Sequence, residues 1–237
     1  MCNALESGGI VAEESQTART PDMLDQRILF VDAEAIVIDK PNGLPVDTPR
    51  RGGDSIVSRL DELKLGFQRP PVPMHRLDQD TSGCLLLARS PKARSSLQQA
   101  FEQRRVDKYY LAVIDGEIAD EEGVIDLALA KRSSEKAGWR MVVDAKGDSA
   151  ITHWRRVEIR DGKTLVEFKP LTGRTHQLRV HAREAFGRGI VGDRVYGVPG
   201  GPMLLHASRL VVPRDKKATI DVTAPLPEHF GEWRDEA

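Results

Sequence analysis

Residues 83–114 read GCLLLARSPKARSSLQQAFEQRRVDKYYLAVI, and this stretch decides the fold. The run at 83–88 is continuously apolar, which is typical of a strand buried on both faces. Ser90 and Pro91 follow as a helix N-cap and a first helical residue. The apolar residues behind them recur at helical spacing, namely Ala93, Leu97, Ala100 and Phe101. Because residues 109–114 are again rich in β-formers, the stretch predicts strand, helix and strand in succession.

Further strands are predicted on both sides of this unit. Upstream, β-formers at 28–31 and 36–38 are interrupted at Asp32–Glu34, which indicates a hairpin. Downstream, Asp161-Gly162 is a good hairpin turn. The strands predicted there cover residues 123–129, 139–144, 150–159, 164–170, 203–212 and 218–223. Many strands and few helices favour an α+β fold with a mixed, mostly antiparallel sheet.

Two more helices are predicted. Residues 54–64 are expected to be helical, with Asp54 as the cap. Their apolar stripe consists of Ile56, Val57, Leu60 and Leu63. The second helix, at 176–186, is expected to be capped by Thr175 and stopped by Gly187. We expect residues 27–237 to form one domain, and the aperiodic, acidic residues 1–26 to form a mobile tail.

Composition places the chain among globular proteins. It has 237 residues, a formal net charge of −1 and 40% hydrophobic residues, which excludes disordered and collagen-like classes. No apolar run approaches the ~20 residues that a membrane-spanning helix needs. The acidic N-terminus lacks the features of a signal peptide, and Cys2 and Cys84 are too few for a disulfide framework. We therefore expect a protein of the cytoplasm that does not bind membranes.

The near-zero net charge hides a segregation of charge. Acidic residues concentrate in 1–26 and 115–126, and basic residues in 89–108 and 169–194. If the two basic stretches fold onto one face, they create a surface suited to phosphates; otherwise they are ordinary solvated surface. Charge alone leaves both interpretations open.

Motifs for common cofactors are missing from the sequence. No G-x-G-x-x-G follows a predicted strand, and Gly162-Lys163-Thr164 lacks the earlier glycine of a phosphate-binding loop. There is no G-x-S-x-G elbow of a serine hydrolase. His176 and His181 are five residues apart and point to different faces of a helix, and no cysteine pair lies nearby, which argues against zinc. We expect no metal, nucleotide or redox cofactor.

The segment 73–83, PMHRLDQDTSG, gathers ionisable groups just before the buried strand. It brings His75, Arg76 and Asp78 within four residues of one another. A carboxylate on a loop that a rigid strand anchors is a common way to present a reactive group. An aspartate in a turn often only caps that turn, so Asp78 also has this simpler interpretation.

Two other segments carry candidate binding residues. On the helix at 176–186, His176, Arg179 and Arg183 share one basic face. We expect Arg179 to point outward, where it can bind a carboxylate or phosphate, and His181, at the apolar edge, to be a core histidine. The segment Lys108-Tyr109-Tyr110 begins a strand, so its two tyrosines lie on opposite faces and one of them can meet a ligand.

These segments together resemble a known family. Residues 75–83 (HRLDQDTSG) are similar to the H-R-L-D-x-x-T-S-G signature of RluA-type pseudouridine synthases. The further segments that resemble the family, in its order, are 40–46 (KPNGLPV), 108–110 (KYY), 172–181 (TGRTHQLRVH), 192–197 (GDRVYG) and 205–207 (LHA). Six matches in one order over roughly residues 27–225 make chance a poor explanation. Family members often carry a small basic RNA-binding domain before the catalytic one, where this chain has its acidic stretch, so substrate choice is expected to rest on the catalytic domain.

The resemblance implies an activity and a set of site residues. The enzyme would cut the N1–C1′ bond of a uridine in structured RNA, transfer RNA or large-subunit ribosomal RNA, rotate the base and rejoin it through C5. Asp78 would attack C1′ or remove the C2′ proton, Arg179 would orient it, and Tyr110 would stack on the base and help to remove the C5 proton. Arg76 would fill the gap left by the flipped uridine. The remaining substrate contacts would be His75, Lys108, Arg174, His176 and Arg183, and the protein would act as a monomer.

Two other classes of function stay open at this point. The chain could be an RNA-binding or RNA-chaperone module with vestigial catalysis, although Asp78, Tyr110 and Arg179 are all present. A glycosidase would need a second carboxylate at a suitable distance, and Asp80 is too close along the turn.

Overall fold

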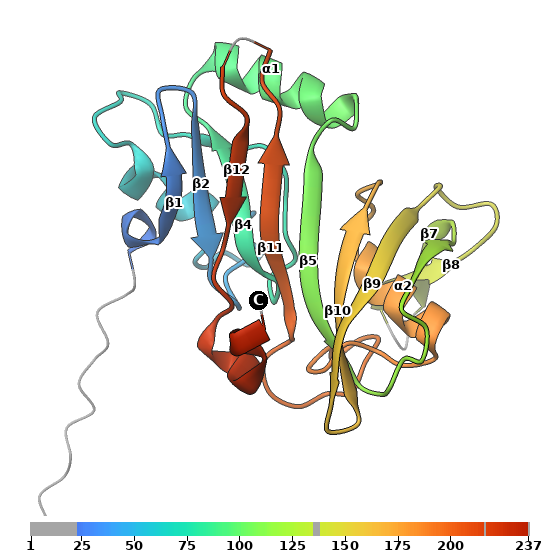
Figure 1. The fold of residues 1–237 in the computed structure, drawn as a ribbon. Coiled ribbons are helices and arrows are strands. Elements are labelled where there is room, and N and C mark those ends of the chain that lie inside the picture. The colour runs from blue at the N-terminus through green and yellow to red at the C-terminus, as the bar shows by residue number, and fades with distance from the viewer. Residues whose placement is uncertain (1–22, 135–137, 216, 237) are drawn as a thin grey trace, which may run out of the picture.

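The computed structural model describes residues 23–134, 138–215 and 217–236. Within them, ten strands form one sheet in the order β1-β2-β4-β11-β5-β10-β9-β6, with β3 paired to β4 and β12 to β11 (Figure 1). Those strands are β1 (Ile28–Val31), β2 (Ala35–Lys40), β3 (Val72–Pro73), β4 (Ser82–Ala88), β5 (Asp107–Ile114), β6 (Glu122–Asp126), β9 (Ile151–Arg160), β10 (Lys163–Pro170), β11 (Leu205–Val212) and β12 (Ile220–Thr223). The pairs are antiparallel except for β4 with β11. The predicted α+β class is confirmed.

Strand β4 lies deep in the sheet, between β2 and β11. All seven of its residues are buried, as its unbroken apolar run predicts. Gly83 has a φ of +105°, and a Cβ there would overlap the backbone of Ala207 on β11. Only glycine allows the two strands to approach this closely. The Thr81-Ser82-Gly83 end of the signature is thus fixed by sheet packing.

Helix α1 (Pro91–Glu102) crosses one end of the sheet (Figure 1). The Ser90 side chain accepts a hydrogen bond from the Ala93 N–H, 3.2 Å away, so the predicted cap and the predicted helix are both confirmed. Leu97 and Ala100 are buried against β4, while Phe101 is only partly buried.

The other half of the sheet supports helix α2 (Gln177–Phe186), whose Leu178 and Ala182 pack on Phe168 of β10. The predicted hairpin turn joins β9 to β10, with positive φ at both Asp161 (50°) and Gly162 (69°). A separate two-stranded sheet, β7 (Leu129–Ser134) with β8 (Gly138–Val143), lies beside α2 (Figure 1).

Several local predictions were wrong in detail. Residues 57–63 form a 3-10 helix, η2 (Val57–Leu63), and Val57 is exposed while its predicted partners in the stripe are buried. The reason is local: the Ser58 hydroxyl donates to the Ser55 carbonyl and the Ser58 N–H to the Ser55 hydroxyl, in competition with α-helical bonds. The strand predicted at 123–129 ends at Asp126, because Leu129 leaves the large sheet and pairs with Val143 on β8.

The N-terminal boundary of the domain also differs from the prediction. Leu24, in the short 3-10 helix η1 (Leu24–Arg27), is fully buried. Its N–H donates to a carboxylate oxygen of Glu62 at 2.7 Å. Leu24, which lies within the predicted tail, is therefore packed against the domain, and residues 1–22 lie outside the described residues. A last 3-10 segment, η3 (Glu228–Glu236), covers the back of the sheet through Phe230 and Trp233.

Candidate active site

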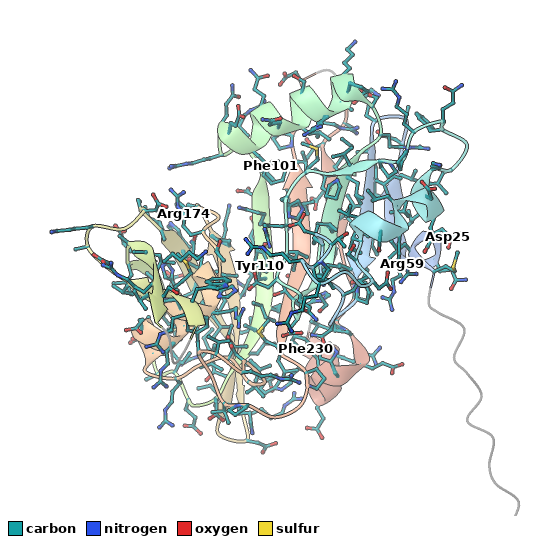
Figure 2. All side chains as sticks on the ribbon, turned by 180° about the vertical axis from the view of Figure 1, so that it is seen from behind. Asp25, Arg59, Phe101, Tyr110, Arg174 and Phe230 are labelled. Carbon is teal, nitrogen blue, oxygen red and sulfur yellow. The ribbon has the colours of Figure 1, made fainter. Side chains whose placement is uncertain are left out.

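A pocket of about 310 Å³ opens near the middle of the sheet, where its two halves meet. Its walls are the loop at 75–81, the start of β5, the end of β10, the start of α2 and the ring of Phe101. Figure 2 shows Tyr110 near the middle of the sheet, with Phe101 above it and Arg174 to one side. Segments far apart in the sequence thus meet at one opening.

Asp78 reaches this pocket from the loop between β3 and β4. Its side chain is 25% exposed. Its neighbour Leu77 is buried in the core, and the Asp78 carbonyl accepts the Thr81 N–H at 3.1 Å, which closes the turn. Because its backbone shapes the turn, the Asp78 carboxylate is left free to face the pocket. The structure therefore supports the presenting loop that the sequence predicts.

Arg179 is buried and does not point outward, which corrects the prediction from helical spacing. Its guanidinium donates to Asp78 at 2.9 Å through Nη1, and to both carboxylate oxygens of Asp193 at 2.7 and 2.8 Å through Nε and Nη2. Burial works to lower the pKa of Arg179, but the bonds to Asp193 and the charges of Asp193 and Asp78 raise it above its ordinary value. Arg179 is therefore a fixed cation between two carboxylates.

Asp193 is a residue whose role the sequence analysis missed. It is 1% exposed, and its carboxylate also accepts the N–H groups of Val195 and Tyr196 at 2.8 and 3.1 Å. Burial alone would raise the pKa of Asp193, but the hydrogen bond and charge of Arg179 lower it. The one signal in the sequence was the resemblance of segment 192–197 to the family, since the burial of Arg179 is visible only in the structure.

The two tyrosines of β5 lie on opposite faces, as strand alternation predicts. Tyr110 lines the pocket, whereas Tyr109 lies near the cations of Lys169 and Arg209. Burial, assisted by the Asp78 charge, raises the pKa of Tyr110, so its hydroxyl keeps its proton at neutral pH. Lys108 also lines the pocket, and burial lowers its pKa.

His176 lies at the start of α2 with a φ of +53°, in the left-handed region. His176, and not the predicted Thr175, is therefore the N-cap residue of the helix. The ring Nδ1 is 2.9 Å from the Tyr196 hydroxyl, which accepts the Met141 N–H, and Nε2 is 3.8 Å from the Asp78 carboxylate. Burial lowers the pKa of His176, with the Asp78 charge opposing. A neutral imidazole thus sits against the pocket carboxylate.

His75 and Arg76 take different places although they are neighbours. Both line the pocket, but His75 accepts the Leu86 N–H at 3.1 Å through Nε2, and burial lowers its pKa to about 3. Arg76 keeps its side chain 73% exposed, with Asp47 at 3.1 Å. His75 therefore supports the loop, and Arg76 is an exposed side chain at the mouth of the pocket, paired with Asp47.

Of the other predicted contacts, one lies at the pocket and one does not. Arg174 lines it and donates to the Ser149 carbonyl at 3.0 Å. Arg183 is exposed, lies outside the pocket and donates to the Gly187 carbonyl at 3.2 Å, at the C-terminal end of α2. His181 is a core histidine as predicted, bonded to Thr152 and to the Leu127 carbonyl.

Lys40 is a second residue whose role was missed. It is fully buried, and its ammonium donates to the carbonyls of Pro41, Leu44 and Gln79 at 2.7–3.0 Å. Burial lowers its pKa to about 7, while nearby aspartates, Asp80 and Asp78 among them, oppose the shift. Lys40 ties the loop after β2 to the loop that carries Asp78.

Comparisons with known proteins identify the family to which the chain belongs. The model of the RNA pseudouridylate synthase family matches residues 34–184. An uncharacterised RNA pseudouridine synthase of Zymomonas mobilis is 50% identical over 212 residues, 88% of this chain and 97% of the relative. A dual-specificity RNA pseudouridine synthase of Haemophilus ducreyi is 35% identical over 196 residues, 78% of this chain and 85% of the relative.

Solved structures of RNA pseudouridylate synthases share the fold of this chain. Human RNA pseudouridylate synthase domain containing 1 has a TM-score of 0.71 at 31% identity, covering 84% of this chain and 82% of that one. Human RNA pseudouridylate synthase domain containing 4 has a TM-score of 0.73 at 27% identity, and the match covers 87% of this chain and 91% of that one. The chain belongs to the RluA-type RNA pseudouridine synthases, and it is an isomerase that acts on RNA.

No helix in the described part of the chain has the length and apolar character needed to cross a membrane.

Proposed function

We propose that the chain converts uridines in stem-loops of transfer RNA or large-subunit ribosomal RNA to pseudouridine, with Asp78 as the essential carboxylate. One observation carries this assignment: Asp78 faces the pocket while Arg179, itself anchored by Asp193, holds one of its oxygens at 2.9 Å. A carboxylate held by one oxygen keeps a second oxygen for the substrate. Such preorganisation of a reacting group contributes strongly to catalysis.

The reaction requires one bond to break and another to form at the same sugar carbon. If Asp78 attacks C1′, a C1′–O bond forms as the N1–C1′ bond breaks, and that C1′–O bond breaks again when C5 of the rotated base bonds to C1′. If Asp78 instead removes the C2′ proton as the N1–C1′ bond breaks, it returns that proton when C5 bonds to C1′. On either route the C5 proton leaves to water and N1 takes up one proton. No atom is gained or lost, so the chemistry is an isomerisation.

The other pocket residues hold the substrate during these steps. Tyr110 stacks on the uracil. Because burial raises its pKa, its hydroxyl keeps its proton, and it assists removal of the C5 proton by relaying it to water and not as a phenolate base. Arg76, exposed at the mouth, fills the space that the flipped uridine leaves in the RNA stack. Lys108 and Arg174 bind phosphates beside the pocket, which makes affinity depend on salt.

A binding or chaperone module with vestigial catalysis is the second candidate. It gains support only if the intact Asp78, Tyr110 and Arg179 constellation proves inert. We further propose that the protein is a monomer, that it acts in the cytoplasm and that it needs no cofactor. Gel filtration with light scattering, and activity after exhaustive chelation, test these last points.

The test uses RNA labelled with tritium at C5 of uridine. Wild-type protein and Asp78→Ala are incubated separately with transfer RNA and ribosomal RNA. Tritium released to water by wild type alone supports the proposal and identifies the RNA class. No release from either RNA while binding persists would favour the binding module.

A further inference from the structure

Trp139, at the start of β8, is a large aromatic side chain left exposed beside the pocket. It is 48% exposed, whereas the chain's other two tryptophans, Trp154 and Trp233, are buried. Its ring stacks on His176, with centroids 5.2 Å apart and planes at 24°. Since His176 lies 3.8 Å from the Asp78 carboxylate, the indole extends the pocket wall outward from the reacting group.

The β7–β8 hairpin fixes Trp139 in this place. Strand alternation puts Trp139 and Met141 on one face of the hairpin. Met141 is buried against Val180 of α2, and its N–H is bonded to the Tyr196 hydroxyl. The face is therefore anchored at Met141 and emerges into solvent two residues away, at Trp139. Figure 1 shows the hairpin beside α2.

One cation lies over the exposed ring, and two more lie nearby in the sequence or at the pocket. The Lys131 ammonium is 4.8 Å from the centre of the Trp139 ring. Arg140 is exposed next to Trp139 in sequence, and Arg174 lies at the pocket. An exposed aromatic ring among cations is the combination that binds unpaired nucleotides, because the base stacks on the ring and the phosphates meet the cations.

We propose that Trp139 is a stacking platform for the nucleotide next to the target uridine, with Lys131 and Arg174 binding the adjoining phosphates. The inference rests on the proposed function, since it needs RNA to enter the pocket at Asp78. The occupant is a nucleotide released from its helix when the uridine flips. Trp139 then contributes affinity for unpaired RNA, and not only support for the His176 ring.

Tryptophan fluorescence tests the contact without relying on catalysis. Asp78→Asn protein is titrated with unfractionated bacterial transfer RNA and with ribosomal RNA stem-loops. Because Trp139 is the exposed indole, stacking of a base should quench emission. Adding Trp139→Phe should abolish the quenching, whereas the matched control, Trp233→Phe, should retain it. Quenching that persists without Trp139 would overturn the proposal.

Kinetics separates a binding role from a purely structural one. Trp139→Ala is expected to raise Kd and KM for RNA about tenfold and to lower kcat by a smaller factor, with Trp139→Phe restoring most of the affinity. A fall in kcat with unchanged KM, accompanied by a shifted pH profile, would instead make Trp139 a positioning residue for His176. If wild type quenches but releases no tritium, the proposed reaction fails while the stacking contact stands.

Discussion

The loops around Asp78 and Asp193 hold the same guanidinium, yet they are built for different tasks. Asp193 is buried and accepts four hydrogen bonds, two from Arg179 and two from backbone N–H groups. Asp78 is a quarter exposed and receives one bond from Arg179. A buried carboxylate that accepts four hydrogen bonds from the protein supports structure, because it has no open side toward a substrate. A carboxylate with free lone pairs at a pocket can react.

The largest expected effect comes from Asp78→Asn. We expect the rate of tritium release to fall by at least about 10³-fold, the scale on which loss of an essential catalytic group acts. The free energy of unfolding should change by less than about 1 kcal/mol, because the side chain is partly solvated and keeps its shape. Single-turnover assays and urea unfolding measure the two quantities. An active, correctly folded Asp78→Asn protein would refute the assignment.

Asp193→Asn should have the opposite balance, with a large loss of stability and a smaller loss of activity. Removing the charge leaves Arg179 buried with Asp78 as its one carboxylate, and breaking a buried ion pair costs about 3–5 kcal/mol. We expect a large loss of stability in urea unfolding, with activity reduced through the misplaced Arg179. If Asp193→Asn is as stable as wild type, the two loops do not differ as described.

The free energy of unfolding should depend on pH in two phases, one from buried histidines and one from Asp193. His206 on β11 is fully buried and hydrogen-bonded to the Ser82 hydroxyl. Burial lowers its pKa to about 4, so between pH 6.5 and 4 the unfolded chain binds the proton more tightly. Stability should therefore fall as pH drops through this range, by about 1.4 kcal/mol per pH unit for each such histidine. Asp193, whose pKa is lowered, stabilises the fold at higher pH and loses this contribution only below its ordinary value of 3.8.

Urea unfolding at a series of pH values measures these two phases. His206→Gln is expected to reduce the slope between pH 6.5 and 4 by about 1.4 kcal/mol per pH unit, to leave the share of His75, whose pKa is also lowered, and to leave the Asp193 phase in place. An unchanged slope in His206→Gln would show that other groups carry the proton uptake.

The smallest expected effect separates two arginines of the basic stretch. Arg174→Ala should weaken RNA binding several-fold and reduce the slope of log K against log salt by about 1, as expected for one lost phosphate contact. Arg183 lies outside the pocket, so Arg183→Ala should change the RNA affinity and the salt slope less. Filter binding at several salt concentrations measures the slopes. Equal effects of the two variants would place the RNA path along α2 instead of across the pocket.

Local features were predictable because their causes are local. The apolar run of β4 requires burial on both faces, and Ser90 with Pro91 starts α1 whatever lies around it. The opposite faces of Tyr109 and Tyr110 follow from strand geometry alone. The motif around Asp78 was recognisable because its residues are adjacent in the chain.

The tertiary structure decided what surrounds each side chain. Helical spacing gives the angle of Arg179 about the helix axis, but it cannot show that a later loop covers that face with Asp193. Nor can it show that Arg179 meets Asp78, 101 residues away in the sequence. The sequence by itself determined the buried strand β4, the start of α1 and the loop that presents Asp78. Only folding decided which of two carboxylates was buried and which stayed open, because burial and pairing depend on segments that the chain brings together from a distance.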